Sequence, residues 1–393
     1  MRLLFVKEAL AWPRTAGHDV HCSQMMRALA QMGHEVSLAV VQRPSPESLH
    51  GLGLARCECL DEIAVTGDEP LALSRLQERF RSYWGIDPRR IRAVGRLAED
   101  CRAEAVVVVG LNVLPYLGAV RKSLRIWYAA DEWAWHHLSQ VRLLQRRTWG
   151  EVRAAVVKGL YERSYGPLLD RVWVVSEADR RAMRWVSGVR GLDVVPNGVD
   201  SEYFAPREAV EIEQSCVFWG RLDFGPNVQA LEWFCKRVWP RVRRSAPQAR
   251  FTIYGFQPTP PVRALAGHDG IELIPDLPDL RGEIARHQVV VLPFVSGGGI
   301  KNKLLEAAAL GKPIVCRPKA CGGLRSQSEL PLALARGSRA WCRKLLHLWS
   351  NAEERSHLGT AARFWVRKTH TWPAAASMVV KGLEKREAER QER

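Results

Sequence analysis

The sequence predicts an α/β protein with two domains, each built around a parallel sheet. Its length of 393 residues suits two domains, at roughly 100–200 residues each. Short apolar runs of strand length alternate with stretches of helical periodicity in both halves of the chain. Several of these runs are apolar without interruption, which is typical of parallel strands buried on both faces.

The first elements form one strand–helix–strand unit. Residues 3–6 are a short apolar run, and apolar residues recur at helical spacing from about Cys22 to Met32. Gly33 stands where a glycine commonly ends a helix. A second strand is expected at 35–41. Such a unit implies a parallel sheet.

Later segments of the first half repeat the pattern. Residues 44–100 show it least clearly, with one helical stretch near 73–84. Further strands are expected at 105–109, 125–130 and 171–175.

The second half alternates again from Cys216 onward. A long helix is expected from Asn227 to about Arg244. Further helices are expected near 280–285 and 302–310, with strands at 217–219, 251–254, 271–274, 289–293 and 313–316.

The domain bounds follow from this pattern. Residues 1–190 are expected to form the first domain and residues 216–362 the second. The turn-rich stretch 191–215, which contains Pro196-Asn197-Gly198, is the expected connection. Residues 363–393 are expected to form a terminal helix with a charged tail.

The chain is strongly basic. It has 58 Lys and Arg against 42 Asp and Glu, a net charge of +16. This favours anionic partners: nucleic acid, an anionic membrane surface or phosphorylated substrates. Within 138–165, apolar residues alternate with arginines and lysines, as in a basic amphipathic helix that lies on a membrane. A core-facing helix with a solvated basic face explains the same pattern.

The expected compartment is the cytoplasm, with the membrane's inner face as a peripheral site. The nine cysteines are an odd number without CxxC spacing, which favours reduced thiols. No apolar run reaches the ~18–20 residues of a membrane-spanning helix. The first residues carry a charge within their only apolar run, unlike a secretory signal.

The segment 292–313, LPFVSGGGIKNKLLEAAALGKP, carries the clearest chemistry. Its three glycines allow close backbone approach to a ligand, and the helix that follows offers its positive N-terminal end to an anion. Lys301 and Lys303 add positive charge, and Glu306 is placed to accept hydrogen bonds from hydroxyls such as a ribose diol. This spacing suits a nucleoside diphosphate. A solvated glycine loop with basic neighbours is the alternative.

Several segments resemble family-4 glycosyltransferases with the GT-B fold. Val194–Phe204 is similar to that family's linker motif. Gly220-Arg221-Leu222, Pro226-Asn227-Val228 and the 297–313 block, of the GGGxKxKxLEA type, are similar to its donor domain. The resemblance is strong over about 120 residues and weaker over 1–41 and near Trp372, where it implies a helix that crosses back to the first domain. It implies two Rossmann-like lobes with parallel sheets facing across a cleft.

The resemblance also implies an activity. The expected enzyme transfers a sugar from a nucleotide-diphosphate sugar to a saccharide or lipid-linked acceptor, in polysaccharide or glycoconjugate biosynthesis. Retention of configuration, with neither metal nor cofactor, is implied as well, and no DxD-like metal motif is evident. Donor-binding residues are expected at Asn197, Arg221, Gly298, Gly299, Ile300, Lys301, Lys303 and Glu306.

Two positions depart from the family's pattern. Glu306 matches the second residue of a Glu-x7-Glu motif, but Gly298 replaces the first. The lysine expected about five residues after Arg221 is replaced by Pro226 or Asn227, so Lys301 or Lys303 would substitute for it. The donor sugar cannot be inferred from this motif.

Acceptor-side candidates follow the strand at 125–130. Asp131, Glu132, His136 and His137 would lie at its carboxyl end, where α/β sheets bind ligands. Of these we expect Asp131 and His136 to take part in catalysis. Helix capping by Asp131 is an equally good explanation. His18 and His21 are weaker candidates, and a purely conformational role is open for Asn197.

Competing functions remain at this level. A nucleic-acid-binding protein would explain the charge, but no RRM, KH, helix-turn-helix or zinc signature is present, so we expect no nucleic acid partner. A non-catalytic sugar-nucleotide-binding paralogue would explain Gly298. A non-hydrolysing epimerase would need a further acid/base pair that the sequence does not reveal.

Overall fold

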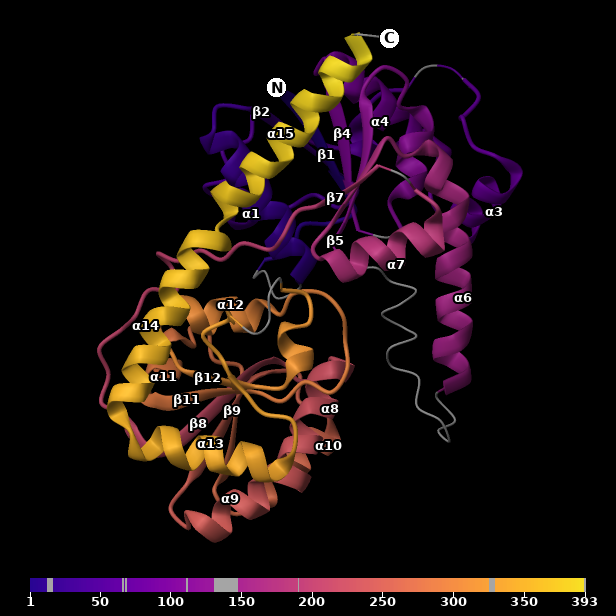
Figure 1. Cartoon of the computed structure of the whole chain (residues 1–393). Coiled ribbons are helices and arrows are strands. Elements are labelled where there is room, and N and C mark those ends of the chain that lie inside the picture. Colours follow the sequence, from indigo (N-terminus) through magenta and orange to yellow (C-terminus); the bar gives the residue numbers. More distant parts are fainter. Residues whose placement is uncertain are drawn as a thin grey trace. The chain divides into compact units, whose positions relative to one another are not determined.

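The chain divides into two structural units. The computed structural model describes residues 1–12, 17–65, 67, 69–110, 112–130, 148–189, 191–324 and 329–391. Unit 1 comprises Met1–Pro196 and Trp372–Arg393, and unit 2 comprises Asn197–Thr371 (Figure 1). The expected α/β architecture with two parallel sheets is confirmed.

Unit 1 contains, within its described residues, a seven-stranded sheet of order β3-β2-β1-β4-β5-β6-β7. All of its strand pairs are parallel. Leu4 on the central strand pairs with Ser37 on one side and Val106 on the other. The strands are β1 (Arg2–Lys7), β2 (Glu35–Val40), β3 (Arg56–Cys59), β4 (Ala105–Val109), β5 (Leu124–Ala130), β6 (Arg171–Val174) and β7 (Leu192–Val194).

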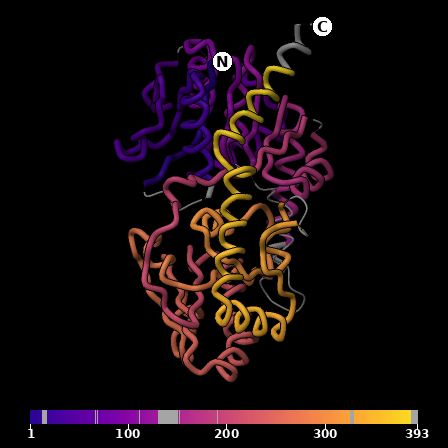
Figure 2. Tube along the Cα trace, turned by 60° about the vertical axis from the view of Figure 1, so that its left-hand side comes forward, coloured from indigo at the N-terminus to yellow at the C-terminus, as the bar shows by residue number. Residues whose placement is uncertain are grey.

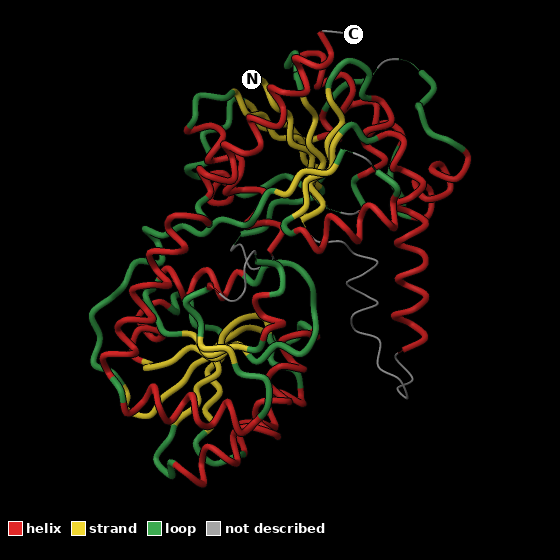
Figure 3. Tube along the Cα trace, in the orientation of Figure 1, coloured by secondary structure: helices red, strands yellow, loops and turns green. Residues whose placement is uncertain are grey.

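Both faces of this sheet are buried. Leu4 and Val6 contribute to one hydrophobic cluster, while Leu3 and Phe5 contribute to another. Successive side chains of a strand point to opposite faces, so a strand apolar at every position needs cover on both. Figure 3 shows helices around the strands. This arrangement explains the uninterrupted apolar runs.

Several helices of unit 1 begin at recognisable capping residues. Ser74 and Gln77 form a reciprocal capping box at α3, and Asp87 and Ser176 cap the first turns of α4 and α7. The helices are α1 (Gly17–Gln31), α2 (Pro46–Leu49), α3 (Arg75–Tyr83), α4 (Pro88–Asp100), α6 (Thr148–Tyr165), α7 (Glu177–Ser187) and α15 (Trp372–Gln391).

The terminal helix α15 belongs to unit 1, where it packs on α1 (Figures 1 and 2). Ala376 and Val379 share a buried cluster with Met25 and Leu29 of α1. The chain therefore returns to unit 1 at Trp372.

Unit 2 repeats the topology of unit 1 with one strand fewer among the described residues. Its parallel sheet has the order β10-β9-β8-β11-β12-β13. The strands are β8 (Ile212–Arg221), β9 (Arg250–Phe256), β10 (Ile271–Pro275), β11 (His287–Leu292), β12 (Ile314–Cys316) and β13 (Ala333–Leu334).

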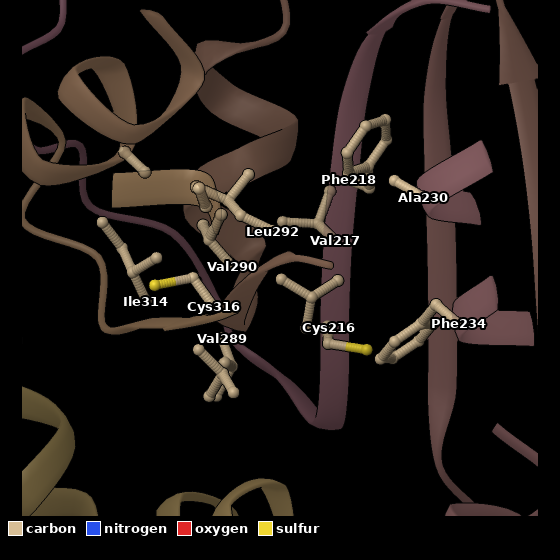
Figure 4. Close-up of a cluster of buried hydrophobic side chains, with 14 of the residues drawn as sticks. Cys216, Val217, Phe218, Ala230, Phe234, Val289, Val290, Leu292, Ile314 and Cys316 are labelled. Atoms are coloured by element: carbon tan, nitrogen blue, oxygen red, sulfur yellow. The ribbon is translucent and has the colours of Figure 1, made fainter. Parts of the chain in front are cut away.

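The core of unit 2 surrounds its central strands. Val217 and Phe218 of β8 lie among Val290 and Leu292 of β11 and Ala230 of α8, and all five side chains are fully buried (Figure 4). Both faces of β8 are covered in this way. This packing holds β8 in place, and with it the residues at the carboxyl end of the strand.

One expected helix of unit 2 is interrupted. The stretch 227–244 forms α8, a π-helical turn and α9 rather than one regular helix. Pro240 lacks the N–H that an uninterrupted helix needs, which accounts for the irregular turn before it. The helices are α8 (Gly225–Trp233), the π turn η4 (Phe234–Val238), α9 (Trp239–Ser245), α10 (Pro260–Arg263), α11 (Arg281–Arg286), α12 (Asn302–Ala309), α13 (Ser338–Ser350) and α14 (Ala352–Thr369).

The unit boundaries differ from the expected ones. Residues 192–194 of the expected connection form β7, and β8 already begins at Ile212, so the connection is shorter than 191–215. The second boundary falls at Thr371 rather than at 362, because α14 packs on α12 and belongs to unit 2. Strand pairing and packing, which a turn-rich composition does not reveal, determine both limits.

The basic stretch at 138–165 is only partly described, from Thr148 onward, as α6. Its side chains do not separate into one apolar and one basic face. Val156 and Leu160 are 57% and 53% exposed, whereas the side chain of Glu162 is buried. Arg153 and Arg163 lie on the exposed side as well. The described part of this stretch is therefore not a core-facing helix with a purely basic outer face, because α6 carries apolar residues on both its inner and outer surfaces.

Candidate functional site

The candidate site lies at the carboxyl ends of β8 and β11. The chain adds β9 and β10 on one side of β8 and then crosses to β11 on the other side. Open α/β sheets bind ligands at such a switch of strand order, because the connections leave in opposite directions. β8 ends with Trp219, Gly220 and Arg221, and β11 is followed by the loop at 293–301.

The expected glycine-rich loop has the conformation that needs glycine. Gly297 and Gly299 have φ of +90° and +64°. A Cβ atom on Gly297 would lie 3.1 Å from Lys301 Nζ and 3.3 Å from Pro226 Cγ. The neighbouring Ser296 donates to Gln229 Oε1 at 2.8 Å, which ties the loop to α8. Gly298 and Ile300 belong to the same short segment, with Ile300 buried in the core.

Two ammonium groups lie beside this loop. Lys301, the residue before α12, donates to the Gly298 carbonyl, and its Nζ lies 5.4 Å from the centre of the Phe294 ring. Lys303 Nζ lies 3.5 Å from Asn227 Oδ1. Burial lowers the pKa of Lys303 to about 8, against the opposing influence of Glu306. Such a buried cation favours an anionic ligand, because the anion offsets its lost hydration.

Glu306 lies one turn further along α12. Its Oε2 accepts a hydrogen bond of 2.9 Å from Trp219 Nε1. Burial raises the pKa of this carboxyl, while Trp219 and Lys303 act in the opposite direction. The site therefore combines cations and one carboxylate, as an anion carrying hydroxyl groups would require.

Arg221 occupies the rim of the site. Its Nε and Nη2 donate to the carboxylate of Asp223 at 3.1 and 2.6 Å, and its side chain is 43% exposed. Such an exposed ion pair is what we would expect of an arginine with no ligand-binding role. The Arg221 carbonyl accepts from Asn227 Nδ2 at 2.6 Å, which holds Asn227 beside Lys303.

Asn197 is joined to the same loop. Its Nδ2 donates to Asn302 Oδ1 at 2.8 Å and to the Ile300 carbonyl at 3.4 Å. Its side chain is buried, and its carbonyl lies 3.0 Å from His370 Nδ1. These contacts fit a conformational role, since they tie the first residue of unit 2 to the start of α12.

The acceptor-side candidates Asp131, Glu132, His136 and His137 lie outside the described residues. Of the weaker candidates, His18 is half-exposed with Nε2 3.7 Å from Asp19 Oδ1, whereas His21 is buried between Tyr128 and Trp372.

A buried ion pair stands at the corresponding edge of unit 1. Lys7, the last residue of β1, lies 2.7 Å from Asp19 in the first turn of α1. The apolar run at 3–6 ended the expected strand before Lys7, so this pair was not predicted.

Sequence reasoning missed Trp219, which falls in an expected strand without a site role. It connected Asn227 with the site only as a replacement for a family lysine, not as a partner of Lys303. The position of Trp219 could have indicated a site role, because it is almost the last residue of a buried strand, at the edge where ligands bind.

The described residues offer neither a clustered metal site nor a membrane-spanning helix. No group of three or more His, Cys, Asp or Glu side chains is placed there to hold a metal ion. No helix in the same part of the chain is long and apolar enough to span a bilayer.

Two family models match the chain. Residues 15–203 match the model described as Glycosyltransferase Family 4, and residues 213–351 match the model described as Glycosyl transferases group 1. Together these ranges span most of both units. The chain belongs to the GT-B glycosyltransferase family. The curated proteins contain no match to it.

Solved structures share the fold of this glycosyltransferase over nearly its whole length. HepE from Anabaena, in complex with UDP and glucose, is 12% identical, with a TM-score of 0.70 over 98% of this chain and 99% of that one. Sucrose-phosphate synthase from Thermosynechococcus elongatus is 15% identical, with a TM-score of 0.70 over 99% and 100%. TarM from S. aureus is 10% identical, with a TM-score of 0.69 over 98% and 100%.

Proposed function

We propose that this glycosyltransferase transfers a sugar from a nucleoside-diphosphate sugar to a saccharide or lipid-linked acceptor. The observation that carries the proposal is the placement of Lys303 and Glu306 together at the switch point of the unit 2 sheet. A cation and a carboxylate at one site match the diphosphate and the ribose hydroxyls of such a donor. The complexes of HepE with UDP-glucose and with UDP support the same class of donor.

The bond-breaking step places negative charge on the leaving nucleoside diphosphate. Lys301, Lys303 and the backbone amides at the start of α12 stabilise that charge in the transition state. These cations would take the role of a divalent metal ion, so we propose a metal-independent reaction. Retention at the anomeric carbon is proposed from the resemblance to family-4 glycosyltransferases alone. Arg221 would contribute as well, by leaving its ion pair with Asp223 and pairing with the diphosphate instead.

Catalysis on the acceptor side is proposed on the sequence alone. Asp131 and His136 follow β5 and would lie at the carboxyl edge of the unit 1 sheet. We propose that they orient the acceptor hydroxyl. Polysaccharide or glycoconjugate biosynthesis is the pathway class that such acceptors imply.

A panel of nucleotide sugars tests the donor assignment. UDP-, GDP-, ADP- and dTDP-sugars are screened by thermal shift, because a ligand selective for the folded state raises its melting temperature. Nucleoside diphosphate release is then measured with the donors that bind. Glu306→Ala and Arg221→Ala should abolish turnover at unchanged secondary structure.

Three other outcomes would contradict the proposal. Donor binding without turnover under any acceptor would indicate the non-catalytic paralogue. Full activity in both variants would overturn the site. Salt-sensitive binding to random oligonucleotides, with no response to any nucleotide sugar, would indicate a nucleic-acid-binding protein.

We also propose that unit 1 associates peripherally with an anionic membrane surface. Two features support this: the exposed stripe of α6, where Arg153 and Arg163 flank Val156 and Leu160, and the 76% exposed Trp185 on α7. Flotation with anionic and with neutral liposomes tests the proposal, with Trp185→Ala expected to weaken binding. Failure to float with both kinds of vesicle would remove it.

A further inference from the structure

The hydrogen bond between Trp219 and Glu306 joins two elements that are distant in the sequence. Trp219 lies near the end of β8 and is 5% exposed, and Glu306 is on α12. The distance from Nε1 to Oε2 is 2.9 Å. An indole N–H is a donor only, so its orientation toward the carboxylate is unambiguous.

This bond makes the two oxygens of Glu306 unequal. Oε2 accepts from the protein, whereas no hydrogen bond within the described part of the chain reaches Oε1. Glu306 is only half-buried, so Oε1 is the oxygen available to a ligand. The carboxylate is thus divided into a protein-facing half and a ligand-facing half.

The indole orients the carboxylate without neutralising it. An ammonium or guanidinium group in its place would offset the negative charge, whereas a neutral donor leaves that charge for the ligand's hydroxyls. A free glutamate also loses rotamer entropy when a ligand immobilises it. The Trp219 hydrogen bond already restricts the Glu306 side chain in the folded protein, so less entropy is lost when the ligand binds.

The neighbouring cation acts on a different part of the ligand. Lys303 stands one turn before Glu306, against Gly220 and Asn227. Among the described residues its one hydrogen bond is the long one of 3.5 Å to Asn227 Oδ1. Lys303 is therefore matched to the anionic part of a ligand. Trp219 acts only through Glu306, and so only on the hydroxyl-bearing part.

We propose that Trp219 is a positioning residue for ribose recognition: it holds Oε2 of Glu306 so that Oε1 accepts a hydroxyl of the bound nucleotide. The inference rests on the proposed function and extends it, because it assigns ribose selectivity to a residue on β8. Trp219 discriminates ribose from a sugar that lacks these hydroxyls, and it has no part in holding the diphosphate.

Calorimetric binding of UDP, GDP and ADP and of their 2′,3′-dideoxy counterparts tests this role in the full-length protein. Trp219→Phe removes the donor but keeps an aromatic ring. The affinity of this variant for the preferred ribonucleotide should fall about tenfold, as expected for one hydrogen bond to a charged group, while its affinity for the dideoxy counterpart stays unchanged.

Trp239→Phe is the matched control. Trp239 is also buried in unit 2, at 2% exposure, and its Nε1 donates to the Asp269 carbonyl at 2.9 Å. Both variants lose an indole hydrogen bond and some packing volume. Only Trp219→Phe should change the ratio of ribonucleotide to dideoxynucleotide affinity.

A double-mutant cycle separates positioning from a general structural effect. In the Glu306→Ala background, Trp219→Phe should cause no further loss of ribonucleotide affinity. An equal tenfold loss in both backgrounds, or equal affinity ratios in the Trp219→Phe and Trp239→Phe variants, would overturn the role of Trp219 and leave the proposed function intact. Absence of wild-type binding to every nucleotide would overturn the proposed function and the inference together.

Discussion

Gly220 and Lys303 lie in direct contact: a Cβ atom on Gly220 would overlap both Cε and Nζ of Lys303. Gly220 also has a φ of +129°, where residues with a side chain are strained. The absence of a side chain at Gly220, near the end of β8, therefore leaves room for the Lys303 ammonium of α12. This contact links the fold of unit 2 to the charge of its site.

Gly220→Ala should lower both stability and nucleotide affinity. The added methyl group strains the backbone and displaces the Lys303 ammonium, so we expect a loss of about 1–3 kcal/mol in the free energy of unfolding. Urea denaturation and calorimetry measure the two effects. Gly282→Ala in α11, where a Cβ atom would meet open space, is the control and should not be destabilising. Normal nucleotide affinity in Gly220→Ala would contradict the placement of Lys303.

The pKa of Lys303 predicts how nucleotide binding depends on pH. Burial lowers it from 10.5 to about 8, and only the protonated amine attracts a diphosphate. Affinity should therefore fall as the pH rises through about 8. In Lys303→Met, affinity at pH 7 should be about tenfold lower and nearly independent of pH between 7 and 9. Lys319→Met, at an exposed lysine of the same unit, should keep the wild-type profile.

The same shift has an opposite effect on stability. Between pH 8 and 10.5 the unfolded chain keeps the Lys303 proton that the folded chain has released, so the contribution of this group to stability rises with pH. Lys303→Met should raise the melting temperature at pH 7 while it weakens binding. A destabilised Lys303→Met variant would show that the ammonium is satisfied in the unliganded protein.

The stability of the protein should depend on Asn197 donating hydrogen bonds rather than accepting them. Its Nδ2 faces two acceptors, Asn302 Oδ1 and the Ile300 carbonyl. Asn197→Ala should cost about 1–2 kcal/mol of unfolding free energy, and Asn197→Asp more, because a carboxylate would face those acceptors. Chemical denaturation measures both. Equal stability of the Ala and Asp variants would mean that the amide does not donate to the loop.

The Lys7–Asp19 pair should contribute far more than an exposed pair. Both side chains are about 95% buried, so Lys7→Met leaves a buried carboxylate without its cation and should cost about 3–5 kcal/mol. Adding Asp19→Asn should recover part of that loss. Arg43→Met, which breaks the exposed pair with Glu62, is the control and should cost about 1 kcal/mol or less. Similar losses at the two sites would contradict the burial argument.

Local pattern was sufficient for much of the fold and for part of the site. The apolar runs at 105–109 and 289–293 predicted strands because a parallel strand must be apolar on both faces. The glycines before α12 predicted a loop whose backbone a ligand can approach closely, and Gly297 and Gly299 have the left-handed conformation that glycine permits. These features depend on neighbouring residues alone, so the sequence records them directly.

Other features depend on which partners the folded chain brings together. The turn-rich stretch after Gly191 holds a strand, because Val172 and Val174 pair with Leu192 and Val194. Arg221, which we expected to contact a diphosphate, is paired with Asp223 two residues away. Residue type alone does not show whether an arginine binds a ligand or a neighbouring carboxylate.

The sequence by itself determined two α/β domains, a glycine-rich loop and the residue types of an anion site. The tertiary structure decided which side chains act together. Trp219 and Glu306 are 87 residues apart and meet only because β8 and β11 are neighbours in the sheet. Strand order brings these ends together, and burial then lowers the pKa of Lys303 and raises that of Glu306. Pairing and pKa are therefore properties of the folded chain.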